Sequence, residues 1–282
     1  MSSPVWFITG ASNGFGLLLC LRALKAGHKV VGTVRSKAKS ADAVQQIEAA
    51  GGQVVELDLN ESQASITAKV QAVGPIDYLV NNAGFFIMGA VEQVTEQEAQ
   101  QQFQTNFFGP LYVTQAALPG MRSRRSGTIV NLSSVAAQDP RPTSGLYAAS
   151  KAALEATSAA LAAEVAAFGI GVLVVEPGAF RTNFFAALSR PARALPAGYE
   201  GTPAGAAQKG YVGGGPALPG DPRKGADRIY EAVHGEGMAG HLKGKVARLV
   251  IGPDALRRMR QKNDKFLADL QLQEEVTLST DF

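Results

Sequence analysis

A tyrosine and a lysine four residues apart are the first side chains in this sequence that could do chemistry. Tyr147 and Lys151 lie in the stretch SGLYAASKAAL, which we expect to be helical, so their side chains share one helical face. A free phenol has a pKa of roughly 10, and a neighbouring ammonium lowers that value by favouring the phenolate. Such a phenol can donate a proton to a carbonyl oxygen that receives hydride, or accept one from an alcohol that loses it. Alone, the pair is weak evidence, because chance supplies it often.

Three glycines near the amino terminus form a second candidate site. Gly10, Gly14 and Gly16 lie in ITGASNGFG, between the first predicted strand and the first predicted helix. A tight turn there needs a residue without a Cβ atom, and a second missing Cβ lets a pyrophosphate approach the backbone. The amino terminus of the helix then offers free N–H groups and a partial positive charge. In this context of strand, turn and helix, the glycines predict dinucleotide binding.

Short apolar runs alternate with longer helical runs, and these elements must position both sites. Strands are predicted at 5–9, 29–34, 53–58, 77–82, 127–134, 171–177 and 247–251. Helices are predicted at 15–26, 41–50, 62–73, 95–125 with a break near Gly109 and Pro110, 145–168, 223–234 and 253–271. Continuous apolar strands joined by helical crossovers indicate a parallel sheet that is buried on both faces. We therefore expect an α/β fold: a single Rossmann-type, doubly wound domain over residues 1–282, with about seven parallel strands and helices on both faces.

The spacing of the glycines differs from the common Gly-x-Gly-x-x-Gly pattern. With Thr9 they form Thr-Gly-x-x-x-Gly-x-Gly, and this motif resembles the classical short-chain dehydrogenase/reductase (SDR) family. Further motifs follow in the order that the family has: Asn-Asn-Ala-Gly at 81–84, the serines of IVNLSS, Tyr-x-x-x-Lys, and Pro-Gly-x-x-x-Thr at 177–182. The resemblance runs from about residue 5 to residue 255, and its strength lies in the set of motifs.

The resemblance implies a catalytic set of four residues. Tyr147 is expected to be the acid or base, and Lys151 its partner, which also binds the nicotinamide ribose. Ser134, in the family's serine position before the tyrosine, is expected to hydrogen-bond the substrate oxygen. Asn106 matches the family's helix asparagine, which holds a bend and a water that links to the lysine. Ser133 is expected to be structural.

The end of the second predicted strand decides which dinucleotide we expect. An acidic residue there binds the 2′-hydroxyl of NAD, whereas a basic one accommodates the 2′-phosphate of NADP. Val34 stands where the acid would be and Arg35 follows it, so we predict NADP(H), with NAD(H) as the less favoured alternative. Asn13 is not the basic residue that many NADP-preferring family members carry, so this prediction depends mainly on Arg35.

The resemblance also implies the remaining cofactor contacts. Asp58 would accept a hydrogen bond from the adenine amino group, although an Asp at this place can equally be a turn residue. Thr182 and the main chain near it would contact the nicotinamide carboxamide. The expected cofactor-binding residues are Gly10, Ser12, Asn13, Gly14, Phe15, Gly16, Arg35, Asp58, Asn82, Ala83, Gly84, Tyr147, Lys151, Pro177, Gly178 and Thr182.

Residues 183–220 stand apart from the regular alternation. The segment is rich in Gly, Pro and Ala, and so long an irregular segment within a compact domain is typically a lid or a binding loop. We predict that it forms a substrate-binding loop with an apolar, aromatic mouth on which few charges converge. The expected substrate-binding residues are Phe85, Phe86, Phe180, Phe184 and Phe185, with Leu188 and Tyr211 nearby.

Together these motifs predict an NADP(H)-dependent oxidoreductase that interconverts a ketone and a secondary alcohol by hydride transfer. The small-molecule substrate is expected to be hydrophobic or aromatic. Two alternatives stay open. One is a dehydratase or epimerase that uses the same Tyr147 and Lys151, and the other is a non-catalytic NADP-sensing binding protein.

Composition and charge argue against other classes of function. The net charge is +3 and the basic runs are short, so no nucleic-acid partner is expected. No window approaches the run of about 18 apolar residues that a membrane span needs. Cys20 is the single cysteine, which permits a reducing compartment, and we expect a cytoplasmic protein. We expect no metal site, and His28, His234 and His241 are predicted to lie on the surface or in loops.

The predicted helix at 145–168 is apolar on all sides over its later part. Residues 152–168 carry only Glu155 and Glu164 as charges, and a helix of that kind is expected to be buried all round. One face is expected to cover the sheet and the other to pack on a second subunit. Members of the family that this chain resembles commonly pair such helices across a two-fold axis, so we predict a homodimer or a homotetramer.

Overall fold

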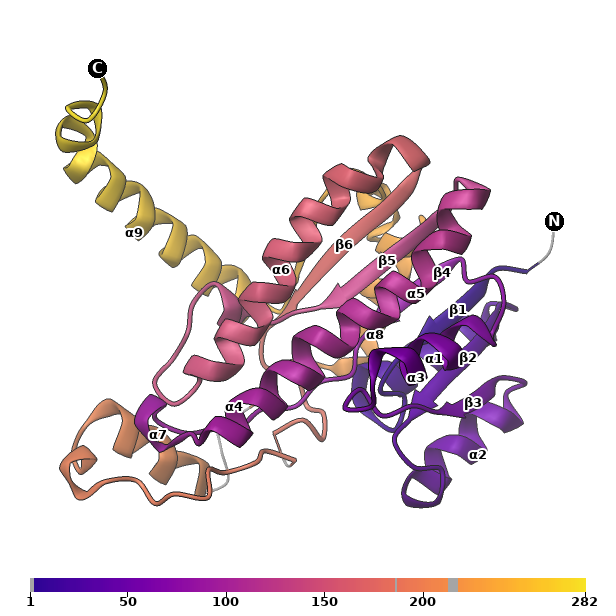
Figure 1. The fold of residues 1–282 in the computed structure, drawn as a ribbon, viewed down its shortest axis with the longest axis horizontal. Coiled ribbons are helices and arrows are strands. Elements are labelled where there is room, and N and C mark those ends of the chain that lie inside the picture. The colour runs from indigo at the N-terminus through magenta and orange to yellow at the C-terminus, as the bar shows by residue number, and fades with distance from the viewer. Residues whose placement is uncertain (1–2, 186, 213–217) are drawn as a thin grey trace.

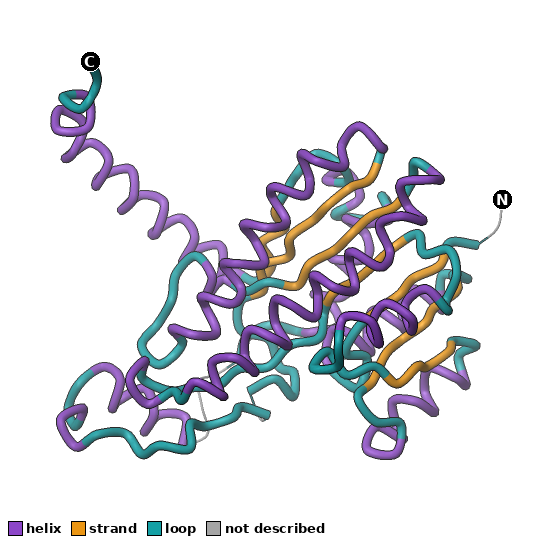
Figure 2. The backbone as a smooth tube through the Cα atoms, viewed as in Figure 1, coloured by secondary structure: helices purple, strands orange, loops and turns teal. Residues whose placement is uncertain are grey.

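The centre of the protein is a seven-stranded parallel β-sheet, seen in a computed structural model that describes residues 3–185, 187–212 and 218–282 (Figures 1 and 2). The strands lie in the order β3-β2-β1-β4-β5-β6-β7. Their bounds are β1 Val5–Ile8, β2 Lys29–Val34, β3 Gln53–Glu56, β4 Tyr78–Asn81, β5 Gly127–Leu132, β6 Ile170–Pro177 and β7 Arg248–Ile251. All pairings are parallel, which confirms the predicted doubly wound α/β fold.

Helices cover both faces of the sheet. In the described part of the chain the α-helices are α1 Gly14–Lys25, α2 Ala41–Ala49, α3 Gln63–Gln71, α4 Glu96–Phe103, α5 Gly109–Arg124, α6 Gly145–Val165, α7 Pro203–Val212, α8 Pro222–His234 and α9 Pro253–Leu278. Shorter helices are η1 Ala38–Ser40, η2 Val91–Gln93, η3 Gln104–Phe108, η4 Val135–Ala137, η5 Ala166–Phe168, η6 Ala197–Tyr199 and η7 Gly240–Leu242. In Figure 1, α5 and α6 lie in front of the sheet and α8 lies behind it.

Alternate side chains of each strand point to opposite faces, and they divide the core into two clusters. Trp6 and Ile8 of β1 pack with residues of α1, α2 and α8 on one face. Phe7, between them, packs on the other face with residues of α3, α5 and α6. This burial on both faces explains why the strands read as continuous apolar runs in the sequence.

The strand order reverses at β1 and β4, whose crossovers leave on opposite faces. The carboxyl ends of the strands at such a reversal diverge and leave a crevice in which α/β proteins bind ligands. A buried chain of side chains supports this edge: the Asn81 amide donates to Oδ1 of Asn131 (2.8 Å) and to Oγ1 of Thr114 (3.0 Å). Asn131 in turn donates to Oγ of Ser158 on α6 (2.7 Å).

The helical region predicted at 95–125 is interrupted slightly earlier than expected. The break is a turn of π-helix, η3, over Gln104–Phe108, directly before Gly109 and Pro110. Pro110 sits in the first turn of α5, where its missing N–H removes no hydrogen bond. Single π-turns of this kind occur frequently at functional sites, and this one contains Asn106.

Two segments are more helical than predicted. The segment 183–220 contains the short helix α7 and the turn η6, and the last helix continues to Leu278 instead of ending near residue 271. Residues 186 and 213–217 of the predicted loop, and the side chain of Tyr211, lie outside the described residues. No helix within the described ranges is both long and apolar enough to cross a lipid bilayer.

His28 lies in the loop before β2, one of the two places predicted for the histidines, whereas His234 is the last residue of α8. His28 and His234 are half-buried and pack edge to face, with ring centroids 4.7 Å apart. The buried Trp6 donates from Nε1 to Nδ1 of His28 (2.9 Å) and stacks on Tyr78 and Tyr230. This aromatic cluster closes the amino-terminal end of β1, opposite the crevice.

Candidate active site

A cavity of about 790 Å³ lies at the carboxyl ends of the strands. Residues from the turn after β1 and from the ends of β2 to β6 line it, so it occupies the crevice at the reversal of strand order. All the predicted site residues except Gly16 and Asn106 contribute to this lining: Gly10, Ser12, Asn13, Gly14, Phe15, Arg35, Asp58, Asn82, Ala83, Gly84, Phe85, Phe86, Ser134, Tyr147, Lys151, Pro177, Gly178, Phe180, Thr182, Phe184 and Phe185.

Two glycines, one in the turn between β1 and α1 and one in the first turn of α1, have no room for side chains. Gly10 has φ +69°, and a Cβ atom there would lie 2.8 Å from the Cα of Ala83. A Cβ at Gly16 would lie 2.3 Å from the carbonyl oxygen of Gly10. Gly16 therefore acts through packing under the turn, which explains why it does not line the cavity.

The end of β4 holds this turn in place. The side chain of Asn82 donates to the carbonyl oxygens of Thr9 (2.9 Å) and Gly10 (3.0 Å). The hydroxyl of Thr9 accepts from the main-chain N–H groups of Asn82 and Ala83, each at 3.0 Å. The predicted tie between strand ends is thus present, and it leaves the N–H groups at the start of α1 open to the cavity.

Arg35 and Asp58 lie at the cavity wall formed by the ends of β2 and β3. Arg35 is exposed and lines the cavity beside Thr33 and Val34. Asp58 accepts with Oδ1 from the main-chain N–H (3.0 Å) and the side-chain amide (2.8 Å) of Asn60. Asp58 is therefore a turn residue, as one of the two interpretations expected, and it also faces the cavity.

Tyr147 and Lys151 are both buried on the inner face of α6. Burial raises the pKa of Tyr147 to about 12, although a hydrogen bond with Ser134 acts in the opposite direction. The lowering of the phenol pKa that the sequence suggested is therefore wrong for this structure, because desolvation outweighs the favourable contacts. Burial lowers the pKa of Lys151 to about 8, and its Nζ donates to the carbonyl oxygen of Leu132 (2.7 Å).

Asn106 lies beneath the same region, in the π-turn. Its Oδ1 accepts from the N–H of Phe85 (3.0 Å), and its Nδ2 donates to the carbonyl oxygen of Phe85 (3.0 Å) and to Oγ of Ser150 (3.0 Å). A Cβ at Gly84 would lie 3.2 Å from Oδ1 of Asn106 and 3.3 Å from Nζ of Lys151. Asn106 and Lys151 therefore both lie next to Gly84, and the amide of Asn106 joins the π-turn to the segment after β4.

A buried carboxylate network behind the site was not predicted from the sequence. Glu155 is one helical turn after Lys151, and its charge raises the pKa of that lysine against the larger effect of burial. Its carboxylate accepts from Oγ of Ser133 (2.5 Å) and from Nη1 of Arg248 (2.5 Å). Arg248 also binds Glu176, and burial together with the charge of Glu155 raises the pKa of Glu176. In the sequence, only the position of Glu155, four residues after Lys151, indicated this network.

Two of the predicted aromatic residues pack against Tyr147. Phe86 and Phe184 have ring centroids 4.7 Å and 5.7 Å from the Tyr147 ring, and Phe185 packs edge to face on Phe184 at 5.6 Å. Phe180 differs, because it packs edge to face on Phe15 at 5.1 Å and fills the space that a Cβ at Gly225 of α8 would need. Phe180 is therefore largely part of the cavity floor.

The lining also holds more charge than the sequence suggested. Arg141, Arg190, Arg258 and Glu98 join the residues already named. Arg258 is neutralised by Asp139, with Nε 2.7 Å from Oδ2, and Arg141 lies 3.0 Å from the same carboxylate.

Between Ser134 and Tyr147, the buried Thr143 has φ +71°, an unfavourable conformation for a β-branched residue, and it also lines the cavity.

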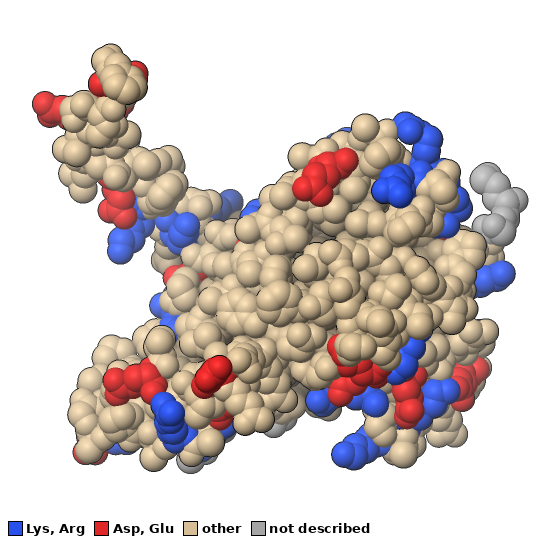
Figure 3. All heavy atoms as spheres, in the orientation of Figure 1, with Lys and Arg blue, Asp and Glu red and all other residues tan. Residues whose placement is uncertain are grey.

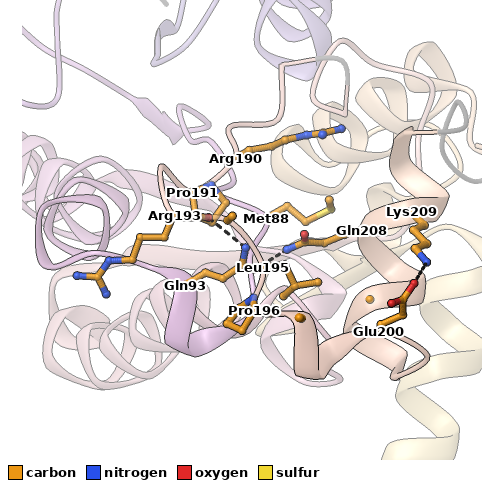
Figure 4. A pocket seen from close by; sticks show the side chains of 13 residues that line it. Met88, Gln93, Arg190, Pro191, Arg193, Leu195, Pro196, Glu200, Gln208 and Lys209 are labelled. Atoms are coloured by element: carbon orange, nitrogen blue, oxygen red, sulfur yellow. Dashed lines mark hydrogen bonds and ion pairs between the residues drawn. The ribbon is translucent and has the colours of Figure 1, made fainter.

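A smaller cavity of about 420 Å³ separates α7 from the body of the protein (Figure 4). At its centre the buried Gln93 accepts from Nε2 of Gln208 on α7 (2.5 Å) and donates to the carbonyl oxygen of Arg193 (3.2 Å). Lys209 and Glu200 pair at 3.4 Å on its rim. Arg190 lines both cavities, and Gln93 is one of several residues that attach the segment 183–220 beside the larger cavity, together with the main chain of Met88, which donates to the carbonyl oxygen of Ser189 (2.9 Å).

The residues present suit a dinucleotide. The turn at Gly10 and Gly16 admits no side chain between a pyrophosphate and the start of α1, and the cavity continues without interruption from Arg35 to Tyr147. Within the described residues, no three His, Cys, Asp or Glu side chains gather in a way that could hold a metal ion.

The fold and the site thus define a dinucleotide-binding α/β protein with a buried tyrosine–lysine pair. The sequence model of the family described as short chain dehydrogenase matches residues 4–192, and the chain belongs to this family, as the resemblance predicted. Oxidoreductase claN of Passalora fulva is 45% identical over 192 residues, which cover 67% of this chain and 88% of that protein.

Solved structures support the same family membership. A short-chain dehydrogenase from Streptomyces avermitilis is 37% identical with a TM-score of 0.86, and the match covers 100% of both chains. A variant of actinorhodin polyketide ketoreductase, solved with NADPH, is 27% identical with a TM-score of 0.71, and the match covers 88% of this chain and 95% of that one. The chain is therefore similar to one short-chain dehydrogenase structure over its whole length, and to oxidoreductase claN over 67% of it.

Proposed function

We propose that this oxidoreductase uses NADP(H) to interconvert a ketone and a secondary alcohol on a hydrophobic or aromatic small molecule. One observation carries the proposal: Ser134, Tyr147 and Lys151 line the same cavity as the glycine turn after β1. A nicotinamide dinucleotide held by that turn supplies or accepts the hydride.

Side chains of this protein supply the proton that the carbonyl oxygen accepts. The hydroxyl of Tyr147 is protonated at neutral pH, because its pKa is raised to about 12, so it can donate to a carbonyl oxygen that becomes an alkoxide. Ser134, already hydrogen-bonded to that hydroxyl, stabilises the same developing charge as a second donor. Lys151, held by the carbonyl of Leu132, lies one helical turn after the tyrosine and brings its positive charge to the same cavity.

The preference for NADP(H) rests on Arg35. This exposed guanidinium lines the cavity at the end of β2, where a 2′-phosphate would lie, and Val34 provides no carboxylate to repel it. The polyketide ketoreductase that this chain resembles was solved with NADPH, which supports the same preference.

The substrate class rests on the surroundings of Tyr147. Phe86 and Phe184 stack on each other with ring centroids 6.5 Å apart and both pack against its ring, so a flat or bulky apolar group beside the carbonyl would be desolvated there. We propose residues 183–220 as the substrate loop of a single domain spanning 1–282, with Gln93 as the residue that holds α7 against the body.

The activity is tested by mixing the protein with NADPH and a panel of aromatic and aliphatic ketones and following NADPH oxidation. Tyr147→Phe is expected to abolish turnover while NADPH binding, measured by fluorescence, stays nearly unchanged; Tyr112→Phe on α5 is the matched control. NADPH binding without turnover across the whole panel would instead identify a sensor. Conversion of a substrate without net change in NADPH would identify a dehydratase or an epimerase.

Cofactor and substrate preference are tested separately. Arg35→Asp is expected to shift the preference toward NADH, whereas Lys37→Asp, two residues along and outside the cavity lining, should not. Equal use of NADH and NADPH by the parent protein would contradict the role of Arg35. Phe184→Ala should raise KM for bulky aromatic ketones more than for small aliphatic ones.

We also propose that the protein works as a homo-oligomer through α6. The outward face of this helix exposes Ala156, Ala159, Ala160 and Ala163, small residues that allow a second helix to approach closely. The molecular mass in solution, measured by light scattering, tests this.

A further inference from the structure

Helix α9 leaves the body of the protein after its first turns and projects into solvent (Figure 1). Among the residues of this helix, Ala255 is buried and Arg258 contacts the body through Asp139. Every residue from 263 to 282 is exposed. We call residues 256–282 the arm.

The arm carries large apolar side chains in contact with solvent. Leu256 is 46% exposed, Phe266 52%, Leu267 58% and Leu270 42%. With Met259 they are separated by three, seven, one and three residues, which places them within one stripe along the helix as far as Leu270. Helices in proteins draw most of their stability from packing of an apolar face, and exposed stripes of this kind mark interaction sites. The stripe therefore indicates a surface that binds a partner.

The two ends of the arm differ in net charge. Its first part is basic, with Arg257, Arg258, Arg260, Lys262 and Lys265 against the single acid Asp264. Its second part carries the acidic residues Asp269, Glu274, Glu275 and Asp281, with no Lys or Arg after Lys265. Figure 3 shows the basic side chains near the body and acidic ones toward the tip.

A second arm in antiparallel orientation complements this pattern. In an antiparallel pair that crosses near Leu267, the basic part of each helix lies beside the acidic part of the other, and Phe266, Leu267 and Leu270 of the two stripes face each other in the middle. A surface that is complementary to itself in this way is the kind that a two-fold symmetric dimer needs. Parallel pairing would instead set like charges side by side at both ends.

We propose that the arm is a docking surface for a second copy of this chain, whose arm lies antiparallel along it. A lipid surface fits less well, because interfacial helices carry Lys and Arg along their polar face, whereas the outer part of the arm is purely acidic. The contact is separate from the α6 face and does not depend on the enzymatic activity.

Charge reversal tests the pairing directly. An acidic variant carries Arg257→Glu, Arg260→Glu and Lys262→Glu, and a basic variant carries Asp269→Lys, Glu274→Lys and Glu275→Lys. Each variant alone places like charges opposite each other and is expected to have half the solution mass of the parent protein. An equimolar mixture restores opposite charges at both ends and is expected to recover the parent mass. Light scattering measures all four samples, and NADPH binding by each variant checks that the fold is intact.

The apolar stripe is tested in the same assay. Leu267→Asp with Leu270→Asp should halve the mass, whereas Leu272→Asp with Val276→Asp, on the opposite side of the helix, should leave it unchanged. Parent mass in both charge variants alone, or no recovery in their mixture, would overturn the proposal. So would a parent protein that is monomeric and sediments with phosphatidylserine vesicles.

Discussion

Glu155 lies one helical turn beyond Lys151 on α6 and accepts a hydrogen bond of 2.5 Å from the hydroxyl of Ser133, the neighbour of Ser134. The buried carboxylate thus contacts the strand end that bears Ser134 and lies on the helix that bears Tyr147 and Lys151. Through Arg248 it also reaches β7. The proposed catalytic groups are therefore supported by one charged network under the sheet edge, and the predictions below address its charges.

The rate of ketone reduction is expected to fall as the pH rises above about 8. The pKa of Lys151 is lowered to about 8, so its positive charge is complete below that pH and is lost above it. Tyr147 keeps its proton throughout this range, because its pKa is raised to about 12. The measurement is kcat/KM for reduction with NADPH between pH 6 and about 10. A rate that stays constant over that range would contradict the assignment.

Glu155→Gln is expected to shift this fall in rate, the alkaline limb of the pH profile, to lower pH. The negative charge of Glu155 raises the pKa of Lys151, and its removal leaves desolvation less opposed. Glu164→Gln, on the exposed side of the same helix, is the matched control and should leave the limb in place. An unchanged limb in both variants would mean that the lysine does not sense Glu155.

Glu176→Gln is expected to stabilise the fold more at pH 8 than at acid pH. The pKa of Glu176 is raised in the folded state, so the folded protein holds a proton that the unfolded chain releases as the pH rises toward neutrality. In that interval the unfolded state binds fewer protons, and the free energy of unfolding falls with rising pH. Glutamine does not titrate, so the free energy of unfolding of the variant does not fall for this reason as the pH rises. Urea unfolding midpoints of parent and variant at acid pH and at pH 8 measure the difference; Glu92→Gln, at an exposed site, is the control. If the midpoints of variant and parent differed by the same amount at both pH values, the prediction would be wrong.

Gly16→Ala is expected to weaken NADPH binding and to lower the stability of the protein by about 1–3 kcal/mol. The added Cβ would lie 2.3 Å from the carbonyl oxygen of Gly10, so the turn must move. Gly198→Ala meets no heavy atom within 4 Å and serves as the control. Thermal unfolding and NADPH titration measure both effects, and a variant that binds like the parent would show that the turn tolerates the shift.

The fold and the positions of the proposed site residues could be predicted from sequence because their signals are local. Strands buried on both faces read as continuous apolar runs, and the glycine spacing identifies the turn after β1. Interactions between distant segments left no such signal: Glu155, Glu176 and Arg248 come from three elements and meet only in the fold. The pKa of Tyr147 was predicted in the wrong direction because a sequence shows the neighbouring lysine but not the loss of water around both groups. The helix α7 was missed because Gly and Pro flank it, and contacts such as Gln93 with Gln208 hold it in place.

Trp6 is the single tryptophan of the chain, and it is fully buried at the end of β1 away from the glycine turn. Its emission therefore comes from one rigid chromophore inside the core. Energy transfer from that indole to a reduced nicotinamide in the cavity would report one defined separation, so quenching on addition of NADPH gives a spectroscopic ruler without any label.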